Sequence, residues 1–152
     1  TVVTLYLLDL VNVQLRPRLL DELRPGTRIV SHAFDMGDWK PDRRENCGSI
    51  NIYKWIVPAK VAGTWEWQTT TGETYRVELK QKYQQLTGKA WIDGKQAQLK
   101  NALIRGDLLE LVVSKKVNTR AIGFIMRAQG KQLIAVEGDL QATPAVKIYP
   151  NP

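Results

Sequence analysis

The chain has 152 residues, of which 43% are hydrophobic and 24% are charged, and its formal net charge is +7. This composition is typical of a globular protein, and no apolar run approaches the roughly 18 residues that a membrane-spanning helix needs. A single histidine excludes a metal site built from several histidines, and a single cysteine excludes an internal disulfide. Neither composition nor cysteine usage indicates a cellular compartment.

The first 34 residues predict a strand, a helix and a second strand. Residues 1–8 are a near-continuous apolar and β-branched run, which is typical of a parallel strand covered on both faces. Leucines then recur at helical spacing, at Leu15, Leu19, Leu20 and Leu23. Residues 28–34 resume the strand pattern. Two strands joined by a helix form a βαβ unit, whose ligand-facing edge lies at the carboxyl ends of the strands.

The ends of this helix carry recognisable signals. Asn12 is a suitable N-cap, and Pro17 predicts either that the helix begins near Pro17 or that its first turn is distorted. Pro25-Gly26 is expected to end the helix, with Gly26 in a left-handed cap.

Polar and aromatic side chains gather at both strand ends, at Tyr6, Asp9, Asn12, His32, Asp35, Asp38 and Trp39. Trp39, between Asp38 and Lys40, either forms a pocket wall or caps the sheet. His32 is either a base or a hydrogen-bonded structural residue.

Four stretches of this region together carry a resemblance to a known family: Tyr6-Leu-Leu-Asp-Leu-Val-Asn12, Leu15-Arg-Pro-Arg-Leu-Leu-Asp-Glu-Leu23, Pro25-Gly-Thr-Arg-Ile-Val-Ser-His32 and Phe34-Asp-Met-Gly-Asp-Trp-Lys-Pro-Asp42. They resemble the second half of a class I S-adenosylmethionine-dependent methyltransferase domain, of the bacterial type with a β-rich C-terminal extension. The resemblance is dense over residues 1–60 and loose beyond. It implies a partial Rossmann-like sheet.

In that superfamily the cofactor is held by a glycine-rich loop after the first strand and by an acidic residue that ends the second. Neither feature occurs in this sequence, which starts within what the resemblance makes the fourth strand. The resemblance therefore implies a C-terminal fragment that is inactive alone and binds no cofactor, while the full-length parent uses S-adenosylmethionine. The expected partner is the missing N-terminal half of the domain, or a second copy through self-association.

The resemblance also suggests roles for the residues at the strand ends. Asn12 and Tyr6 would orient the methyl acceptor, and His32 or Asp35 would take a proton from it. Asp9, Asp38 and Trp39 would contact the substrate, although related sequences tend to carry proline at the position of Asp9.

The rest of the chain has a different character. Ile50–Val57 is predicted to be another strand of the same sheet, and Asp42–Gly48 a loose segment with Cys47 in a loop. Because short strands replace the mixed pattern near Pro58, we place one domain at residues 1–60 and a second at 61–152.

The second domain is predicted to be a meander of eight short strands separated by turns, at residues 64–69, 74–81, 84–92, 96–104, 108–114, 121–127, 132–137 and 145–149. Tyr75, Val77 and Leu79 alternate with charged residues, so one face of that strand should be buried. Eight such strands favour an antiparallel barrel or a sandwich. A barrel of this size is either filled by side chains or holds one small ligand.

The barrel raises an alternative function, a binding module for a small ligand or a partner. Nucleic acid is not expected as a partner, because the positive charge is spread along the chain and no known nucleic-acid motif occurs.

Overall fold

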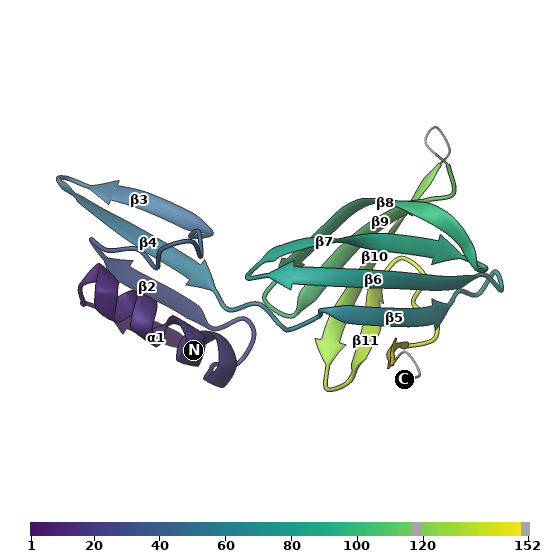
Figure 1. The fold of residues 1–152 in the computed structure, drawn as a ribbon, viewed down its shortest axis with the longest axis horizontal. Coiled ribbons are helices and arrows are strands. Elements are labelled where there is room, and N and C mark those ends of the chain that lie inside the picture. The colour runs from purple at the N-terminus through teal and green to yellow at the C-terminus, as the bar shows by residue number, and fades with distance from the viewer. Residues whose placement is uncertain (117–119, 150–152) are drawn as a thin grey trace. The chain divides into compact units, whose positions relative to one another are not determined.

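The computed structural model describes residues 1–116 and 120–149. The chain divides into two compact units, residues 1–59 and residues 60–152 (Figure 1). The first is a small mixed sheet with one helix, and the second is a closed eight-stranded antiparallel barrel. The predicted fold class is therefore confirmed, with a barrel in place of the sandwich. No helix in the described part of the chain is long and apolar enough to cross a membrane.

The first unit contains β1 (Val2–Leu5), α1 (Asp9–Glu22), β2 (Arg28–His32), β3 (Arg43–Cys47) and β4 (Ile50–Ile56). The strand order in the sheet is β1-β2-β4-β3. β1 and β2 are parallel, with Val2 opposite Arg28 and Leu5 opposite Ser31, so the predicted strand-helix-strand pairing is confirmed. β4 runs antiparallel to β2 and to β3, which also confirms a further strand after Ile50.

The limits of α1 differ from the prediction. Leu8 is the N-cap and makes no side-chain cap bond, while Asn12 lies inside the helix and is fully buried. The predicted N-cap role of Asn12 is wrong, because its side chain bonds to β2 and the following loop instead of to the helix backbone. The helix does not begin near Pro17, which lies within it.

Pro25 and Gly26 form a turn of their own after the helix. The Thr27 N–H donates to the Arg24 carbonyl at 3.0 Å, with Pro25 second in the turn and Gly26 third at φ +90°. Proline followed by a residue of positive φ is the pattern of a type II turn. Gly26 is therefore not the left-handed helix cap that the sequence suggested, since α1 already ends at Glu22 with Leu23 in an extended conformation.

The segment expected to be loose is an ordered hairpin. Residues 43–47 form β3, which pairs with β4 across Gly48-Ser49. Gly48 has φ +72°, and glycine at the first of two turn residues is typical of a type II′ hairpin. Cys47 ends this strand and is exposed, so its placement in a loop is wrong.

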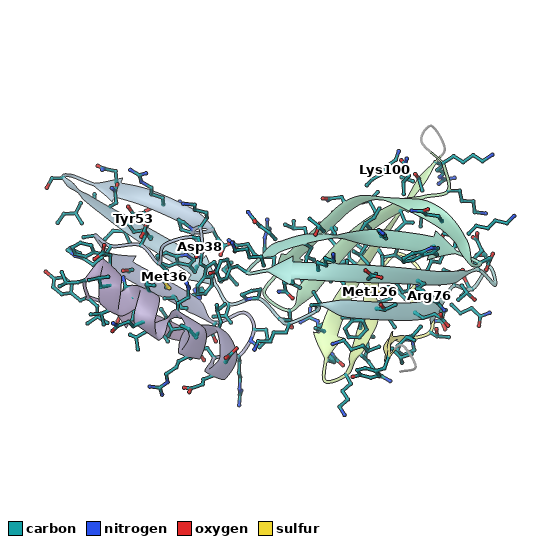
Figure 2. All side chains as sticks on the ribbon, viewed as in Figure 1. Met36, Asp38, Tyr53, Arg76, Lys100 and Met126 are labelled. Atoms are coloured by element: carbon teal, nitrogen blue, oxygen red, sulfur yellow. The ribbon has the colours of Figure 1, made fainter. Side chains whose placement is uncertain are left out.

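Two tryptophans and a methionine anchor the core of the first unit. Met36, labelled in Figure 2 on the loop after β2, has no exposed surface, and neither has Trp39 or Trp55. The Trp55 indole Nε1 donates to the Trp39 carbonyl at 2.8 Å. The loop between β2 and β3 is thereby packed into the core along part of its length.

The barrel contains β5 (Gly63–Gln68), β6 (Thr74–Lys82), β7 (Gln85–Ile92), β8 (Lys95–Arg105), β9 (Leu108–Ser114), β10 (Ala121–Gln129), β11 (Gln132–Glu137) and β12 (Ala145–Ile148). Each strand pairs with the next along the chain, and β12 pairs with β5 to close the barrel (Figure 1). Closure leaves no free sheet edge.

Large side chains occupy the inward-facing positions of the barrel. Tyr75, Val77 and Leu79 are at most 2% exposed, which confirms the alternation predicted for β6. Trp67 stacks on Tyr75 with ring centroids 5.5 Å apart, and Phe124 packs edge-on against both. The interior is thus packed with side chains at these positions.

Asp139 joins two turns at one end of the barrel and makes the stability of this end depend on pH. Its Oδ2 accepts the Thr70 N–H at 2.9 Å and the Thr70 hydroxyl at 3.0 Å, and the first of these bonds is the main cause that lowers the pKa of Asp139. A carboxyl whose pKa is lowered by folding stabilises the protein above its unfolded-state pKa, and that contribution is lost as the pH falls through the folded-state pKa.

We therefore expect the free energy of unfolding of the native protein to fall more steeply below about pH 4 than that of the Asp139→Asn variant. Urea unfolding between pH 2 and pH 6 would measure this difference. Glu137→Gln, which alters an exposed carboxyl two residues away, is the matched control. Equal slopes for the native protein and Asp139→Asn would refute the role of Asp139.

Candidate functional site

The carboxyl ends of β1 and β2 lie side by side because the two strands are parallel. Tyr6 directly follows β1, and His32 ends β2. Their rings are 4.5 Å apart between centroids, at an interplanar angle of 31°. Tyr6 is 80% exposed, whereas His32 is half-buried. The structure therefore brings these two predicted residues together, with one ring open to solvent.

The chain reverses sharply after His32. The Phe34 N–H donates to the His32 carbonyl at 2.9 Å, and Ala33 between them has φ +71°. This is a γ-turn with positive φ, a rare and strained conformation for a residue with a Cβ. The Ala33 N–H donates to the Asn51 carbonyl of β4 at 2.8 Å, which fixes the turn to the sheet.

Asn12 holds this turn from the helix side. Its buried Nδ2 donates to Ser31 Oγ at 3.2 Å and to the Phe34 and Asp35 carbonyls at 3.3 and 3.1 Å. Ser31 Oγ also donates to the Phe34 carbonyl at 2.6 Å. An amide nitrogen has only two hydrogens, so three acceptors share them. The buried Asn12 Oδ1 has no hydrogen-bond partner among the described residues.

The two aspartates after the turn have structural contacts of their own. Asp35 is half-buried, and its Oδ1 accepts the Gly37 N–H at 3.1 Å. Asp38, labelled in Figure 2 near Met36, forms an ion pair with Arg16 at 2.8 Å. The same Arg16 nitrogen donates to the Met36 carbonyl at 2.9 Å. Asn12 and Arg16 of helix α1 thus both bind this loop.

The two remaining predicted residues lie in contrasting environments. Trp39 is fully buried, and its carbonyl accepts the hydrogen bond of Trp55, so its side chain presents no exposed wall to a substrate. Asp9 is the first residue of α1 and is exposed, and its Oδ1 accepts the Leu10 N–H at 2.9 Å.

Sequence reasoning missed Ser31, Ala33, Arg16 and Trp55, all of which position this edge. Arg16 could have been found, because residues four apart share one face of a helix and Arg16 follows Asn12 at that spacing. The strained backbone of Ala33 has no signal in the sequence, since alanine does not favour positive φ.

No arrangement of three or more histidine, cysteine, aspartate or glutamate side chains that could hold a metal occurs in the described ranges. Tyr6 and His32 lie at this edge, Asp35 follows in the loop after β2, and Asn12 and Arg16 bind that loop from α1.

Comparison with known proteins relates part of the chain to methyltransferases. It is 56% identical over 61 residues to a protein-lysine N-methyltransferase of Saccharolobus islandicus (strain REY15A), a match that covers 38% of each protein. It is 52% identical to an RNA methyltransferase from Salinibacter ruber, whose crystal structure contains S-adenosyl-L-homocysteine, over 40% of each chain at a TM-score of 0.39. No family model matches. The chain spans about two fifths of the length of either relative.

Proposed function

We propose that residues 1–59 are the acceptor-facing part of an S-adenosylmethionine-dependent methyltransferase domain, which another polypeptide segment completes. The observation that carries this proposal is the 56% identity to a protein-lysine methyltransferase over 61 residues. The relative extends well beyond the match. The part of the relative that lies outside the match serves as the model for the completing segment.

The two edges of the small sheet support this proposal. The β3 edge carries Arg43, Arg44 and Glu45, charges of the kind that keep an exposed strand from pairing with another chain. The β1 edge is Val2-Val-Thr-Leu5, without charge or proline, and among the described residues β1 pairs only with β2. An apolar edge of this kind favours addition of a further strand.

Exposed apolar side chains next to β1 also support the proposal. Tyr6 is 80% exposed and Leu8 62% in the link from β1 to α1, and Leu10 in the first turn of α1 is 73% exposed. Clustered exposed apolar side chains of this size mark an interaction surface. We propose that the completing segment binds to this surface.

The residues of the first unit do not themselves fit S-adenosylmethionine. The link from β1 to α1, residues 6–8, contains no glycine, and α1 opens with the carboxylate of Asp9. A close approach of backbone to a cofactor generally uses glycine, and no glycine-rich cluster occurs in the sequence. The completing segment would therefore supply cofactor binding.

The proposed roles follow from exposure. Tyr6 is exposed, and His32 and Asp35 are half-buried, so they would contact the methyl acceptor or receive its proton. Asn12 is fully buried and would act through the loop at residues 33–35, as a positioning residue. Asp9 and Asp38 are exposed and would contact the substrate at its periphery.

Reconstitution tests the proposal. We expect isothermal titration calorimetry to show no binding of S-adenosylmethionine or S-adenosylhomocysteine to this chain alone. Mixing the chain with the part of the Saccharolobus islandicus protein outside the matched segment should give a stable complex on size-exclusion chromatography. The complex should transfer radiolabelled methyl groups to protein.

Variants would separate the roles. His32→Ala and Tyr6→Ala should lower transfer at least tenfold, the loss typical of a misplaced reacting group. Tyr149→Ala, which removes an exposed tyrosine of the barrel, should not. Tight binding of S-adenosylmethionine by the chain alone would overturn the proposed division, and self-association without complex formation would identify a second copy as the occupant of the β1 edge.

A further inference from the structure

One part of the barrel wall has an apolar outer surface. Six large apolar side chains in the described part of the barrel are more than a third exposed. Five of them belong to β10, β11, β12 or the segments next to β12: Ile122, Val136, Leu140, Val146 and Tyr149. On β6, by contrast, the outward side chains include Arg76, Glu78 and Lys80. Exposed apolar surface is thus concentrated on β10–β12.

The alternation of buried residues shows which side chains of β10 and β11, neighbours in the wall (Figure 1), form this surface. Phe124 and Met126 are at most 5% exposed, so Ile125 between them points outward. Leu133 is 1% exposed, so Ile134 after it also points outward. Both outward isoleucines are half-buried.

A β-bulge adds Val136 to the same surface. Met126 lies opposite Ala135, whereas Ile125 lies opposite Glu137, so Val136 is the extra residue of the bulge. Val136 is 39% exposed. Residues directly opposite each other in a sheet share a face, so Glu137 points outward together with Ile125.

Strand β12 extends this surface. Val146 is 45% exposed and lies opposite Gln132, two residues before Ile134 on β11. Diagonal neighbours of this kind lie about 7–8 Å apart, within side-chain reach. We call Ile125, Ile134, Val136 and Val146 the apolar face.

Charges of opposite sign lie at the two ends of the apolar face. The carboxylates of Glu110 and Glu137 lie opposite the same residue of β10, one on each neighbouring strand. At the other end, the exposed Lys131 lies in the turn between β10 and β11. Arg127 lies nearer that end but forms an ion pair with Asp107 at 3.3 Å, which neutralises it. The face is therefore negative at one end and positive at the other.

A second copy of the chain fits this distribution of charge. In a dimer with two-fold symmetry one patch packs on the same patch of the other copy. Two sheets that pack face to face keep their strands nearly aligned. With the two copies of β11 antiparallel, the positive end of each face meets the negative end of the other. A strongly acidic or strongly basic partner would instead meet like charge at one end.

We propose that the protein forms a two-fold symmetric dimer through the apolar faces of two barrels. Lys131 of each copy pairs with Glu137 of the other, and Ile134 and Val136 pack near the axis. Four apolar side chains make a smaller contact than the roughly 800 Å² per partner of stable complexes, so the dimer dissociates at about 10 µM to 1 mM. This proposal is independent of the methyltransferase proposal, because it uses residues of the barrel alone.

Sedimentation equilibrium of the full chain over that concentration range tests the proposal. The average mass should rise with concentration from the 17.3 kDa of one chain. Val136→Asp puts a charge into the apolar face and should weaken self-association at least about tenfold. Thr87→Asp is the matched control and should leave it unchanged, because Thr87 is an exposed β-branched residue on β7, opposite Lys80.

Charge reversal tests the symmetry of the contact. Lys131→Glu and Glu137→Lys should each weaken self-association about tenfold, because both pairs between the copies become repulsive. A mixture of these two variants should associate at least as tightly as the native chain, because both pairs then join opposite charges. Circular dichroism checks that each variant is folded, and if Val136→Asp fails to fold, the charge reversals decide.

Several results would overturn the proposal. A mass that stays at the monomer value, equal association of Val136→Asp and Thr87→Asp, or no gain on mixing the two charge variants would each do so. Loss of association in Leu8→Asp but not in Val136→Asp would place the contact at the surface assigned to the completing segment, and would overturn it too. None of these outcomes depends on methyl transfer, so the two proposals fail separately.

Discussion

The Asn12→Asp variant is expected to destabilise the first unit by about 3 kcal/mol or more, because it places a carboxylate in a buried set of acceptors. The Nδ2 of Asn12 donates to Ser31 Oγ and to the Phe34 and Asp35 carbonyls. An oxygen in its place would face the same three atoms without a hydrogen to give. Only the Ser31 hydroxyl could turn toward it, and that would break its 2.6 Å bond to the Phe34 carbonyl.

The loss should depend on pH in a defined direction. Burial and the neighbouring carbonyls disfavour the charged form of the introduced carboxyl, so its pKa in the folded protein should be raised. A raised folded-state pKa means that the destabilisation is greatest at neutral pH and shrinks as the carboxyl becomes protonated on acidification.

Hydrogen exchange followed by mass spectrometry would measure the effect unit by unit. Peptides from β2 and β4 should exchange faster in Asn12→Asp, and peptides from the barrel should not. Gln14→Glu makes the same amide-to-carboxylate change at an exposed position of α1 and is the matched control. If the two variants exchanged alike, the hydrogen bonds of Asn12 would not hold the loop.

Asn12 also illustrates the limit of sequence reasoning at the candidate site. Asparagine near the start of a helix is a good N-cap on local grounds, and the prediction failed because its partners lie 19 to 23 residues away along the chain. The sequence could not decide whether Trp39 forms a pocket wall or caps the sheet, because this too depends on distant contacts. Its ring lies 6.1 Å from that of Trp55 between centroids, and it forms an isolated bridge with Met36, contacts that the local sequence pattern does not reveal.

The bounds of strands in which apolar and polar residues alternate were predicted to within two residues. Tyr75, Val77 and Leu79 show why, since each inward side chain is apolar and each neighbour is polar or charged. β3 was missed because residues 43–47 contain no apolar alternation, and their strand is formed only by pairing with β4. The choice between barrel and sandwich depended on a further distant contact, the pairing of β12 with β5.

Gly88→Ala is expected to destabilise the barrel by about 3 kcal/mol or more, because the backbone of β6 occupies the space of the new side chain. A Cβ at Gly88 would lie 2.0 Å from the Glu78 carbonyl oxygen and 3.3 Å from Leu79 Cα. Both are backbone atoms, so no rotamer change can relieve the overlap.

Gly123→Ala is the matched control, because Gly123 also lies within a strand, β10, and a Cβ there would meet no atom within 4 Å. Neither glycine has positive φ, so the backbone φ angle at each position is one that alanine adopts without strain. Each substitution lowers the entropy of the unfolded chain by a similar amount, which alone would stabilise the protein by up to about 1 kcal/mol. The difference between the two variants therefore isolates the steric overlap at Gly88. Urea unfolding should show that difference at about 3 kcal/mol or more, and equal midpoints would mean that β6 and β7 do not approach as closely as the fold requires.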